Sequence, residues 1–217
     1  MKRSLRLSTI CGALTPCDSF ADVGCDHGYC TLYMLENGLC RTACISDISA
    51  PSLAKAEKLL LRYIQEGRVT SVCCAGLALV PRETEQVLIA GMGGEEMLAI
   101  LREGFLPPVL VLQPMKNAEK VRAFLLENGY APDLDVTFYD SKFYHLLRAR
   151  RGAGRQYSER DVAFGYDNLR APTQDFVRYL RAELEKCARR LEGGDIPALR
   201  ARQTQLSEVL HEIERGV

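Results

Sequence analysis

The fold is decided by one stretch near the N-terminus, Ala21-Asp22-Val23-Gly24-Cys25-Asp26-His27-Gly28-Tyr29. It begins within a short apolar run that is typical of a buried strand, and it leads into a helix predicted over 29–36. In doubly wound α/β sheets, ligands bind at turns of this kind, beyond the carboxyl ends of the strands. Glycine lets the backbone approach the ligand there, because it has no side chain in the way.

The spacing of glycines and acids in this turn distinguishes between ligands. A dinucleotide-binding fold is expected to carry Gly-x-Gly-x-x-Gly, whose free amides cradle a pyrophosphate. Here the spacing is Gly24-x-x-x-Gly28, and two acids, Asp22 and Asp26, bring negative charge into the turn. Carboxylates repel pyrophosphate but suit the positively charged sulfonium and ammonium groups of S-adenosylmethionine. The turn therefore favours a methyl donor over a nicotinamide cofactor.

Alternating strands and helices surround this stretch. Apolar runs and turn signals predict seven strands, at 19–24, 42–48, 69–74, 86–90, 109–112, 134–139 and 142–150. Helices are predicted at 4–14, 29–36, 51–65, 95–103 and 118–128. This alternation implies a parallel sheet, because parallel neighbours need crossover connections, and the last two strands form a hairpin at one edge. We expect an α/β fold: a doubly wound, Rossmann-like, seven-stranded sheet of the methyltransferase type.

The pattern changes after Arg151, where Gly152-Ala153-Gly154 forms a predicted linker. A helix is predicted over 173–191, and a second begins near Pro197 with Asp195 as its cap. Each carries a heptad seam: Val177, Leu180, Leu184, Cys187 and Leu191 in the first, and Ile196, Leu199, Leu206, Leu210 and Ile213 in the second. Two such seams across a short turn predict an antiparallel, coiled-coil-like hairpin. We therefore expect a donor-binding domain over 1–152 and a helical hairpin over 153–217.

Composition excludes several classes of protein. The chain of 217 residues is 47% hydrophobic and 26% charged, as in an ordinary soluble globular protein. No apolar run approaches the roughly 18 residues of a membrane span, and Arg6 interrupts the apolar region that a signal peptide would need. We therefore expect a cytoplasmic protein without membrane contact.

Nine cysteines and three histidines do not form a metal site or a disulfide framework. None of the cysteines are arranged as Cys-x-x-Cys, and most fall inside predicted strands or helices. A thiol at such a position behaves as a small apolar side chain. We expect neither a disulfide framework nor a bound metal.

Charge is balanced overall, with 28 basic and 28 acidic residues, so net charge alone indicates no partner. The basic residues are nevertheless clustered toward the C-terminal part: Arg148, Arg150, Arg151, Arg155, Arg178, Arg181, Arg189, Arg190, Arg200 and Arg202. Solvated helix faces explain any one of them. A basic strip leading from the donor-binding domain into the hairpin would also suit a polyanionic substrate.

Three further strand ends carry candidate residues. Asp47, at the end of the second strand, either accepts hydrogen bonds from ribose hydroxyls or caps the next helix. Combined with the first turn, the ribose role is favoured. The run Gly91-Met92-Gly93-Gly94 after the fourth strand is either a tight turn or a flat backbone surface between the donor and a planar acceptor. Gln113 places a carboxamide at the end of the fifth strand.

These motifs together resemble the bacterial tRNA (adenine-22-N1)-methyltransferase family. The runs that carry the resemblance match in order and spacing: 21–29, Ile89-Ala90-Gly91-Met92-Gly93-Gly94, Leu112-Gln113-Pro114, Gly129-Tyr130, Lys142-Phe143-Tyr144 and Phe164-Gly165. The resemblance covers nearly the whole chain. It implies a class I catalytic domain with a C-terminal pair of helices, and methyl transfer from S-adenosylmethionine to N1 of an adenine in the D-loop region of tRNA.

The resemblance also implies roles for single residues. Those expected at the donor's methionine end are Asp22, Gly24, Asp26 and His27, with Asp47 on the ribose and Gly91 and Met92 at the edge of the transfer site. The full set of predicted cofactor-binding residues is Asp22, Gly24, Cys25, Asp26, His27, Asp47, Ile48, Ala75, Gly76, Leu77, Ala90 and Gly91. The predicted catalytic residues are Asp26, Tyr29, Gly91, Met92 and Gln113.

The chain departs from the family pattern at two informative positions. An acid or asparagine usually stands before Gly-Leu after the third strand, but here Ala75 precedes Gly76-Leu77, which leaves the backbone to contact the donor's adenine. The family's Gln-Pro-Asn is Gln113-Pro114-Met115, which removes a polar group near the acceptor pocket. These departures keep two alternatives open: a methyltransferase for another RNA or small molecule, and a non-catalytic donor-binding protein whose hairpin is an interaction module.

Adenine N1 presents an in-plane lone pair, so methyl transfer to it needs orientation rather than a general base. Asp26 is a candidate to stabilise the developing positive charge. His27 either orients Asp26 or is structural, and the structural interpretation is slightly favoured. Tyr29 either stacks on an extruded base or packs in the core. The sequence is compatible with a monomer or with a dimer formed through the hairpin.

Overall fold

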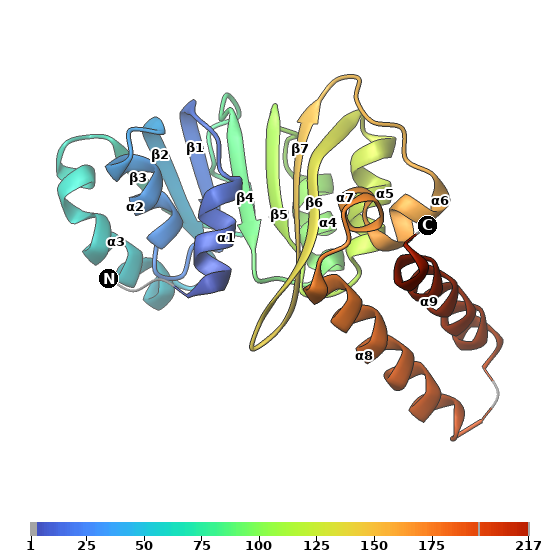
Figure 1. Ribbon diagram of the computed structural model, residues 1–217. Coiled ribbons are helices and arrows are strands. Elements are labelled where there is room, and N and C mark those ends of the chain that lie inside the picture. The colour runs from blue at the N-terminus through green and yellow to red at the C-terminus, as the bar shows by residue number, and fades with distance from the viewer. Residues whose placement is uncertain (1–3, 195, 217) are drawn as a thin grey trace.

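A computed structural model of the chain describes residues 4–194 and 196–216 and contains one seven-stranded sheet (Figure 1). Its strands are β1 (Cys17–Val23), β2 (Cys40–Asp47), β3 (Val69–Cys73), β4 (Gln86–Ala90), β5 (Val109–Gln113), β6 (Tyr130–Asp140) and β7 (Lys142–Arg151). The helices are α1 (Leu5–Ala13), α2 (Tyr29–Glu36), α3 (Ala50–Gln65), α4 (Gly94–Glu103), α5 (Ala118–Glu127), α6 (Glu159–Phe164), α7 (Tyr166–Arg170), α8 (Gln174–Leu191) and α9 (Pro197–Arg215). The predicted α/β class and the seven strands are confirmed.

The strand order is β3-β2-β1-β4-β5-β7-β6. Strands β1 to β5 are parallel, whereas β7 runs antiparallel to both β5 and β6. The chain winds from β1 outward to β3 and then returns to the other side of β1 with β4. The strand order therefore reverses between β1 and β4, which is where ligands bind in sheets of this type.

Alternate side chains of the parallel strands enter two separate cores. Phe20, Ile45 and Leu88 pack with residues of α1, α2 and α3 on one face. On the other face, Val23 and Ile89 pack with residues of α4 and α5. The strands are buried on both faces, which explains why they are continuous apolar runs rather than alternating ones.

Strand β6 begins at Tyr130, so the prediction of a start at 134 was wrong. The Tyr130 hydroxyl donates a hydrogen bond to the carbonyl of Pro107, and Tyr130 pairs with Arg151 of β7. The strand register shifts between Pro132 and Leu134. Proline has no N–H to give to the ladder, so it is accommodated where the ladder is irregular.

Helices α6 and α7 were not predicted, and they occupy part of the segment between Arg151 and α8. A capping box starts α6, in which the Ser158 hydroxyl accepts from the N–H of Asp161 and the Asp161 carboxylate accepts from the N–H of Ser158. Gly165, with φ of +94°, separates the two helices. Helices of six and five residues are too short to show a helical period in the sequence.

The predicted helical hairpin is confirmed as α8 and α9, which pack against each other and extend below the sheet in Figure 1. The buried residues of its core are Phe164, Phe176, Leu180, Cys187, Leu206 and Val209. Phe176 rather than Val177 is therefore fully buried in α8, and Ile196 is 50% exposed at the start of α9. The predicted cap at Asp195 lies outside the described residues.

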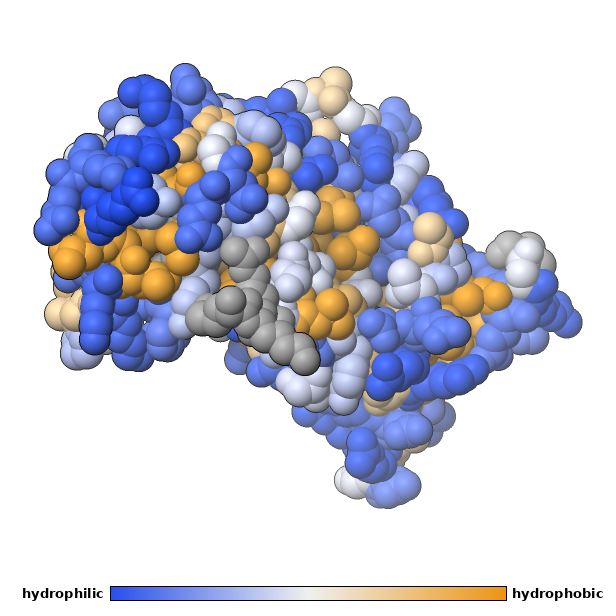
Figure 2. Space-filling model, turned by 60° about the vertical axis from the view of Figure 1, so that its left-hand side comes forward, coloured by the Kyte–Doolittle hydropathy of each residue, from blue (hydrophilic) through white to orange (hydrophobic). Residues whose placement is uncertain are grey.

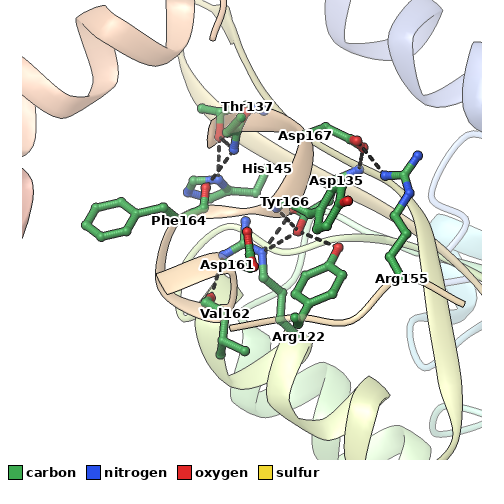
Figure 3. Close-up of polar contacts among 12 residues, drawn as sticks. Arg122, Asp135, Thr137, His145, Arg155, Asp161, Val162, Phe164, Tyr166 and Asp167 are labelled. Carbon is green, nitrogen blue, oxygen red and sulfur yellow. Dashed lines mark hydrogen bonds and ion pairs between the residues drawn. The ribbon is translucent and has the colours of Figure 1, made fainter. Parts of the chain in front are cut away.

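A buried polar cluster joins the base of the hairpin to the sheet (Figure 3). Both carboxylate oxygens of Asp135 on β6 accept hydrogen bonds from Nε of Arg122 on α5, at 3.0 and 2.9 Å. The same carboxylate accepts from the Tyr157 hydroxyl and from the backbone N–H of Tyr166. Arg122 in turn donates to the carbonyl of Val162. The cluster thus connects α5, β6, α6 and α7.

His145 lies in the same region and is half-buried. Its Nδ1 is 3.0 Å from the hydroxyl of Thr137. Burial lowers the pKa of His145 to about 3, and the nearby Arg122 and Arg202 lower it further in the same direction. The imidazole is therefore neutral at physiological pH and acts here as a packed hydrogen-bonding group.

Replacing Asp135 by asparagine leaves the Arg122 guanidinium buried without its counter-ion. We expect Asp135→Asn to lower the free energy of unfolding by about 3–5 kcal/mol, measured by urea denaturation. Asp133→Asn is the matched control, because Asp133 pairs with Arg148 and Arg150 at a partly exposed position and should cost about 1 kcal/mol or less. Equal losses in the two variants would contradict this account of the cluster.

Candidate active site

A pocket with a volume of about 760 Å³ lies where the strand order reverses. The carboxyl ends of β1, β2 and β4 form its floor, and α1, α4 and the turn after β3 form its walls. Every predicted cofactor-binding residue lines it: Asp22, Gly24, Cys25, Asp26, His27, Asp47, Ile48, Ala75, Gly76, Leu77, Ala90 and Gly91. Four predicted catalytic residues line it as well: Asp26, Tyr29, Gly91 and Met92.

Asp22 is a buried carboxyl group at the end of β1. Burial raises its pKa to about 7, although a 3.0 Å hydrogen bond from the Thr31 hydroxyl acts in the opposite direction. Thr31 belongs to α2, so the helix that follows the turn donates a hydrogen bond to the acid that precedes it. A buried carboxylate of this kind is a strong site for a cation, because a positive charge there replaces the lost hydration.

Asp26 is exposed and lies in the same turn, with a φ of +45°. Partial burial raises its pKa, but hydrogen bonds from His27 at 2.8 Å and Lys55 at 3.3 Å outweigh it and lower the pKa below its usual value. Asp26 is therefore ionised. The His27 ring therefore contacts the Asp26 carboxylate, as the interpretation in which His27 orients Asp26 requires.

Asp47 does not cap α3, so the alternative to the ribose role is not supported by its contacts. The cap is Ser49, whose hydroxyl accepts from the N–H of Ser52. Asp47 instead accepts from the N–H of Ser49 at 2.8 Å and from the N–H of Asp26 at 3.3 Å. A carboxylate has about four acceptor positions, so acceptor capacity remains for a ligand.

Tyr29 is half-buried in the pocket wall rather than in the core. Its ring stacks on His27, with ring centres 5.6 Å apart and an interplanar angle of 3°. The two rings therefore lie parallel to each other beside Asp26, and both are partly exposed. The outer face of a partly exposed ring can receive another planar ring.

Glycines are required where elements approach closely around the pocket. A Cβ at Gly24 would overlap the end of the Met92 side chain, and one at Gly76 would lie 2.9 Å from Ile100 of α4. Both glycines have positive φ, +70° and +53°. Both turns therefore need glycine for their backbone conformation, and the turn after β3 needs it for space as well.

Gln113, the fifth predicted catalytic residue, does not line the pocket and is fully buried. Its Oε1 accepts a 2.8 Å hydrogen bond from Nε of Arg6, and its Nε2 donates to the carbonyl of Pro114 and to the sulfur of Met115. Gln113 therefore supports the site from beneath through Arg6. Met115, which stands where the family has asparagine, therefore faces Gln113 through its sulfur atom.

Sequence reasoning did not find the pocket residues contributed by α1 and α4. They include Arg6, Leu7 and Ile10 from α1, and Glu96, Ala99, Ile100 and Glu103 from α4. No local motif marks these positions, because tertiary packing brings them to the strand ends. The one available signal was an arginine in the first turn of a helix, where positive charge is unfavourable.

Other classes of site have no support in the part of the chain that the structure describes. There, no three or more histidine, cysteine, aspartate or glutamate side chains group in a way that could hold a metal ion. No disulfide joins any of the cysteines within the described residues, and burial raises the pKa of Cys44 to about 11. None of the helices within the described ranges is both long and apolar enough to span a membrane.

Comparison with known proteins assigns the family. A methyltransferase domain family matches residues 3–147. A Mycoplasma pneumoniae protein named "Putative tRNA methyltransferase" is 32% identical over 156 residues, which cover 69% of this chain and 70% of the relative. The tRNA (adenine(22)-N(1))-methyltransferase of Bacillus subtilis is 28% identical over 177 residues, which cover 79% of this chain and 72% of the relative. The chain belongs to this tRNA methyltransferase family.

Solved structures agree with the methyltransferase assignment. A Streptococcus pneumoniae protein, described as a "putative tRNA (m1A22) methyltransferase" in complex with S-adenosyl-L-methionine, is 26% identical. It has a TM-score of 0.87, with 97% of this chain and 100% of that chain covered. The similarity therefore includes the helical hairpin as well as the methyltransferase sheet.

The buried Asp22 makes a prediction about pH and stability. The folded protein keeps the Asp22 proton up to about pH 7, whereas the unfolded chain loses it near the ordinary value of 3.8. The folded state therefore binds more protons between these values, and Asp22 destabilises it progressively as pH rises through that window, by up to about 1.4 kcal/mol per pH unit. Asp22→Asn should remove this dependence.

The measurement is urea denaturation of both proteins at several pH values. We expect the stability of Asp22→Asn relative to the parent to increase up to about pH 7 and then to level off. Asp18→Asn, an exposed change at the other end of β1, is the control. A stability difference between Asp22→Asn and the parent that does not change with pH would show that Asp22 is not perturbed.

Proposed function

We propose that the protein transfers a methyl group from S-adenosylmethionine to N1 of an adenine in the D-loop region of tRNA. The observation that carries this proposal is the pocket at the point of strand reversal. There, a buried acid, two further acids and a pair of parallel, partly exposed aromatic rings meet at glycine turns. The family membership of the chain supports the same reaction and substrate.

The residues of the pocket fit the three chemical parts of the donor. The buried Asp22 carboxylate suits the ammonium group, and it sits beside the open backbone of Gly24. Asp47 has acceptor capacity for ribose hydroxyls. Ile48 and Ile100 offer apolar surface to the adenine, and the half-exposed backbone of Gly76 lines the same pocket. Ala75 is at the exposed rim, so backbone rather than a side chain contacts the adenine at this position.

The bound donor supplies an electrophilic methyl group, and the task of the protein is to align the acceptor base with it. Tyr29 and His27 offer the stacking surface for an extruded adenine. Gly91 and Met92 border the space between that surface and the donor end of the pocket. Holding the two reactants in line can supply roughly 7–11 kcal/mol of the barrier. Asp26 stabilises the positive charge that appears on the base.

The arginine strip is only partly available for RNA. Arg148 and Arg150 pair with Asp133, and Arg155 pairs with Asp167. On the hairpin, Arg178 pairs with Asp175 and Arg181 pairs with Glu214. Within the described residues, Arg189 and Arg190 at the end of α8 form no such ion pair, and both are exposed. We propose these two as phosphate contacts.

The hairpin and the site are placed so that one RNA can contact both. The carboxyl ends of the parallel strands point toward the bottom of Figure 1, and α8 extends below the sheet on the same side. The part of the hairpin visible in Figure 2 is largely hydrophilic. We propose that residues 1–152 carry out methyl transfer and that residues 153–217 bind the tRNA body. We further propose that the enzyme is a monomer and acts in the cytoplasm, where tRNA is modified.

The deciding experiment is transfer of labelled methyl from S-adenosylmethionine to unmodified tRNA transcripts, followed by mapping of the modified base. We expect 1-methyladenosine in the D-loop region and no transfer to a transcript in which that adenine is replaced by guanine. Donor binding without transfer to any tRNA would refute the assigned substrate and leave the non-catalytic or other-substrate alternatives.

Asp26→Asn tests the charge-stabilising role. Asparagine tolerates the positive φ of this position, so the turn should keep its conformation. We expect turnover to fall by about tenfold, as for loss of one electrostatic contact to the transition state, while donor affinity changes by less than about threefold. Steady-state kinetics and calorimetric donor binding measure the two effects. Unchanged turnover would show that Asp26 does not act on the base.

The double variant Arg189→Gln/Arg190→Gln tests the RNA contact. Each lost phosphate contact should reduce the salt dependence of tRNA binding, expressed as the slope of log affinity against log salt, by about one. The control is Arg178→Gln/Arg181→Gln, which removes the same charge from arginines that are already paired. If both double variants lower the slope equally, the unpaired arginines have no special role.

A further inference from the structure

Helix α4 presents an acidic side chain to the pocket that no other part of the described chain neutralises. Glu103, the last residue of α4, is exposed and lines the pocket. Within the described residues, its carboxylate forms neither an ion pair nor a hydrogen bond. It also stands in the last turn of the helix, where the helix dipole is negative and an acid is disfavoured. An acid held at such a position indicates a bound partner that donates hydrogen bonds.

The other acid of α4 in the pocket differs from Glu103 in this respect. Glu96 also lines the pocket and lies on the same face of the helix, seven residues earlier. It stands in the first turn of α4, where the helix dipole is positive and stabilises an acid. The position of Glu96 therefore has an explanation within the fold that the position of Glu103 lacks.

Contacts between α4 and the turn after β3 place Glu103 at one end of the pocket. A Cβ at Gly104, the residue after Glu103, would lie 2.7 Å from Cβ of Leu77. One turn earlier, Ile100 lies 2.9 Å from the position that a Cβ at Gly76 would occupy. Both Gly76 and Leu77 line the pocket. The end of α4 is thus packed directly on this turn, and Glu103 belongs to the part of the pocket that the turn forms.

The turn after β3 offers no polar side chain of its own to the adenine. The segment Ala75-Gly76-Leu77 contains no hydrogen-bonding side chain, because Ala75 stands where an acid or asparagine is usual in the family. The turn can therefore contact adenine only through its backbone and through apolar atoms. Glu103 supplies a carboxylate to the same end of the pocket from a different element.

The chemistry of the donor's adenosine part identifies the partner of this carboxylate. Adenosine has two kinds of hydrogen-bond donor, the ribose hydroxyls and the exocyclic amino group of adenine. Asp47, at the end of β2, has acceptor capacity for the hydroxyls. The unprotonated ring nitrogens of adenine are acceptors, so a carboxylate would repel them. The amino group therefore remains as the partner of an acid beside the turn after β3.

We propose that the Glu103 carboxylate accepts a hydrogen bond from the exocyclic amino group of the methyl donor's adenine. Glu103 thereby replaces, from α4, the side chain that is missing at Ala75 in the turn after β3. A hydrogen bond to an ionised acceptor is stronger than one to a neutral acceptor, so the contact selects a purine that carries the amino group. This inference rests on the proposed donor but does not depend on which RNA is methylated.

The test uses two ligands that differ only in this group: S-adenosylhomocysteine and an analogue in which hydrogen replaces the adenine amino group. Calorimetric binding is measured without RNA for the parent and for Glu103→Ala. We expect the parent to bind the analogue roughly 10-fold more weakly, as for loss of a hydrogen bond to a charged group. Glu103→Ala should bind both ligands with similar affinity. Glu103→Gln, which keeps an oxygen acceptor without the charge, should recover part of the preference.

The outcomes separate this inference from its rivals. If Glu103→Ala bound both ligands as the parent does, the preference would come from the backbone of the turn after β3, and the inference would be wrong. Equal weakening of both ligands in Glu103→Ala, with the preference retained, would overturn it and assign a structural role to Glu103. Equal binding of the two ligands by the parent would also overturn it, because the amino group would then contribute nothing.

Glu127→Ala is the matched control. Glu127 is the exposed last residue of α5, which like α4 has 10 residues, and it does not line the pocket. The change should leave both affinities unchanged. If the parent bound neither ligand, the proposed function and this inference would both fail. If the parent bound them with the expected preference but methylated no tRNA, the contact from Glu103 would stand and only the assigned substrate would fail.

Discussion

The reversal of strand order between β1 and β4 is the constraint on which the site depends. Two adjacent parallel strands there continue into helices on opposite faces of the sheet, α2 and α4, so their carboxyl ends leave a crevice between the two turns. Gly24 and Gly91 keep the crevice open, because a side chain at either position would strike Met92 or Arg6. Asp22, Asp26 and Met92 lie in or next to these two turns.

Several acids line the pocket, and the three acids at the ends of β1 and β2 each have different hydrogen-bond partners. Asp22 is buried and relies on one hydroxyl, Asp26 has His27 and Lys55, and Asp47 has two backbone N–H groups. These contacts hold the three acids in one pocket. They also leave Asp22 with the raised pKa, which makes it the acid with most to gain from a bound cation.

The segment that leads from β7 to the hairpin is held to the sheet by polar as well as apolar contacts. Arg122 and Asp135 are almost completely buried, and burial of two charges has a cost that only good geometry offsets. One arrangement of α6 and α7 satisfies both residues, so the cluster favours a single orientation of the segment that leads into α8. In the proposed function, this fixed orientation sets the distance between the hairpin and the active site.

The sequence alone determined the sheet, the hairpin and the acid-rich turn. Apolar runs, glycines and caps are local signals, and the motif at 21–29 places Asp22, Asp26 and Tyr29 within a few residues of each other. The sequence did not predict the early start of β6, because Tyr130 is held by a hydrogen bond to the distant Pro107. It also did not predict the short helices α6 and α7, because α6 begins with a capping box but is too short to show a helical period. Only the tertiary structure decided that Gln113 lies beneath the pocket and that Arg6 enters it. These two residues are more than a hundred positions apart, and only the packing of α1 against the strand ends brings them together.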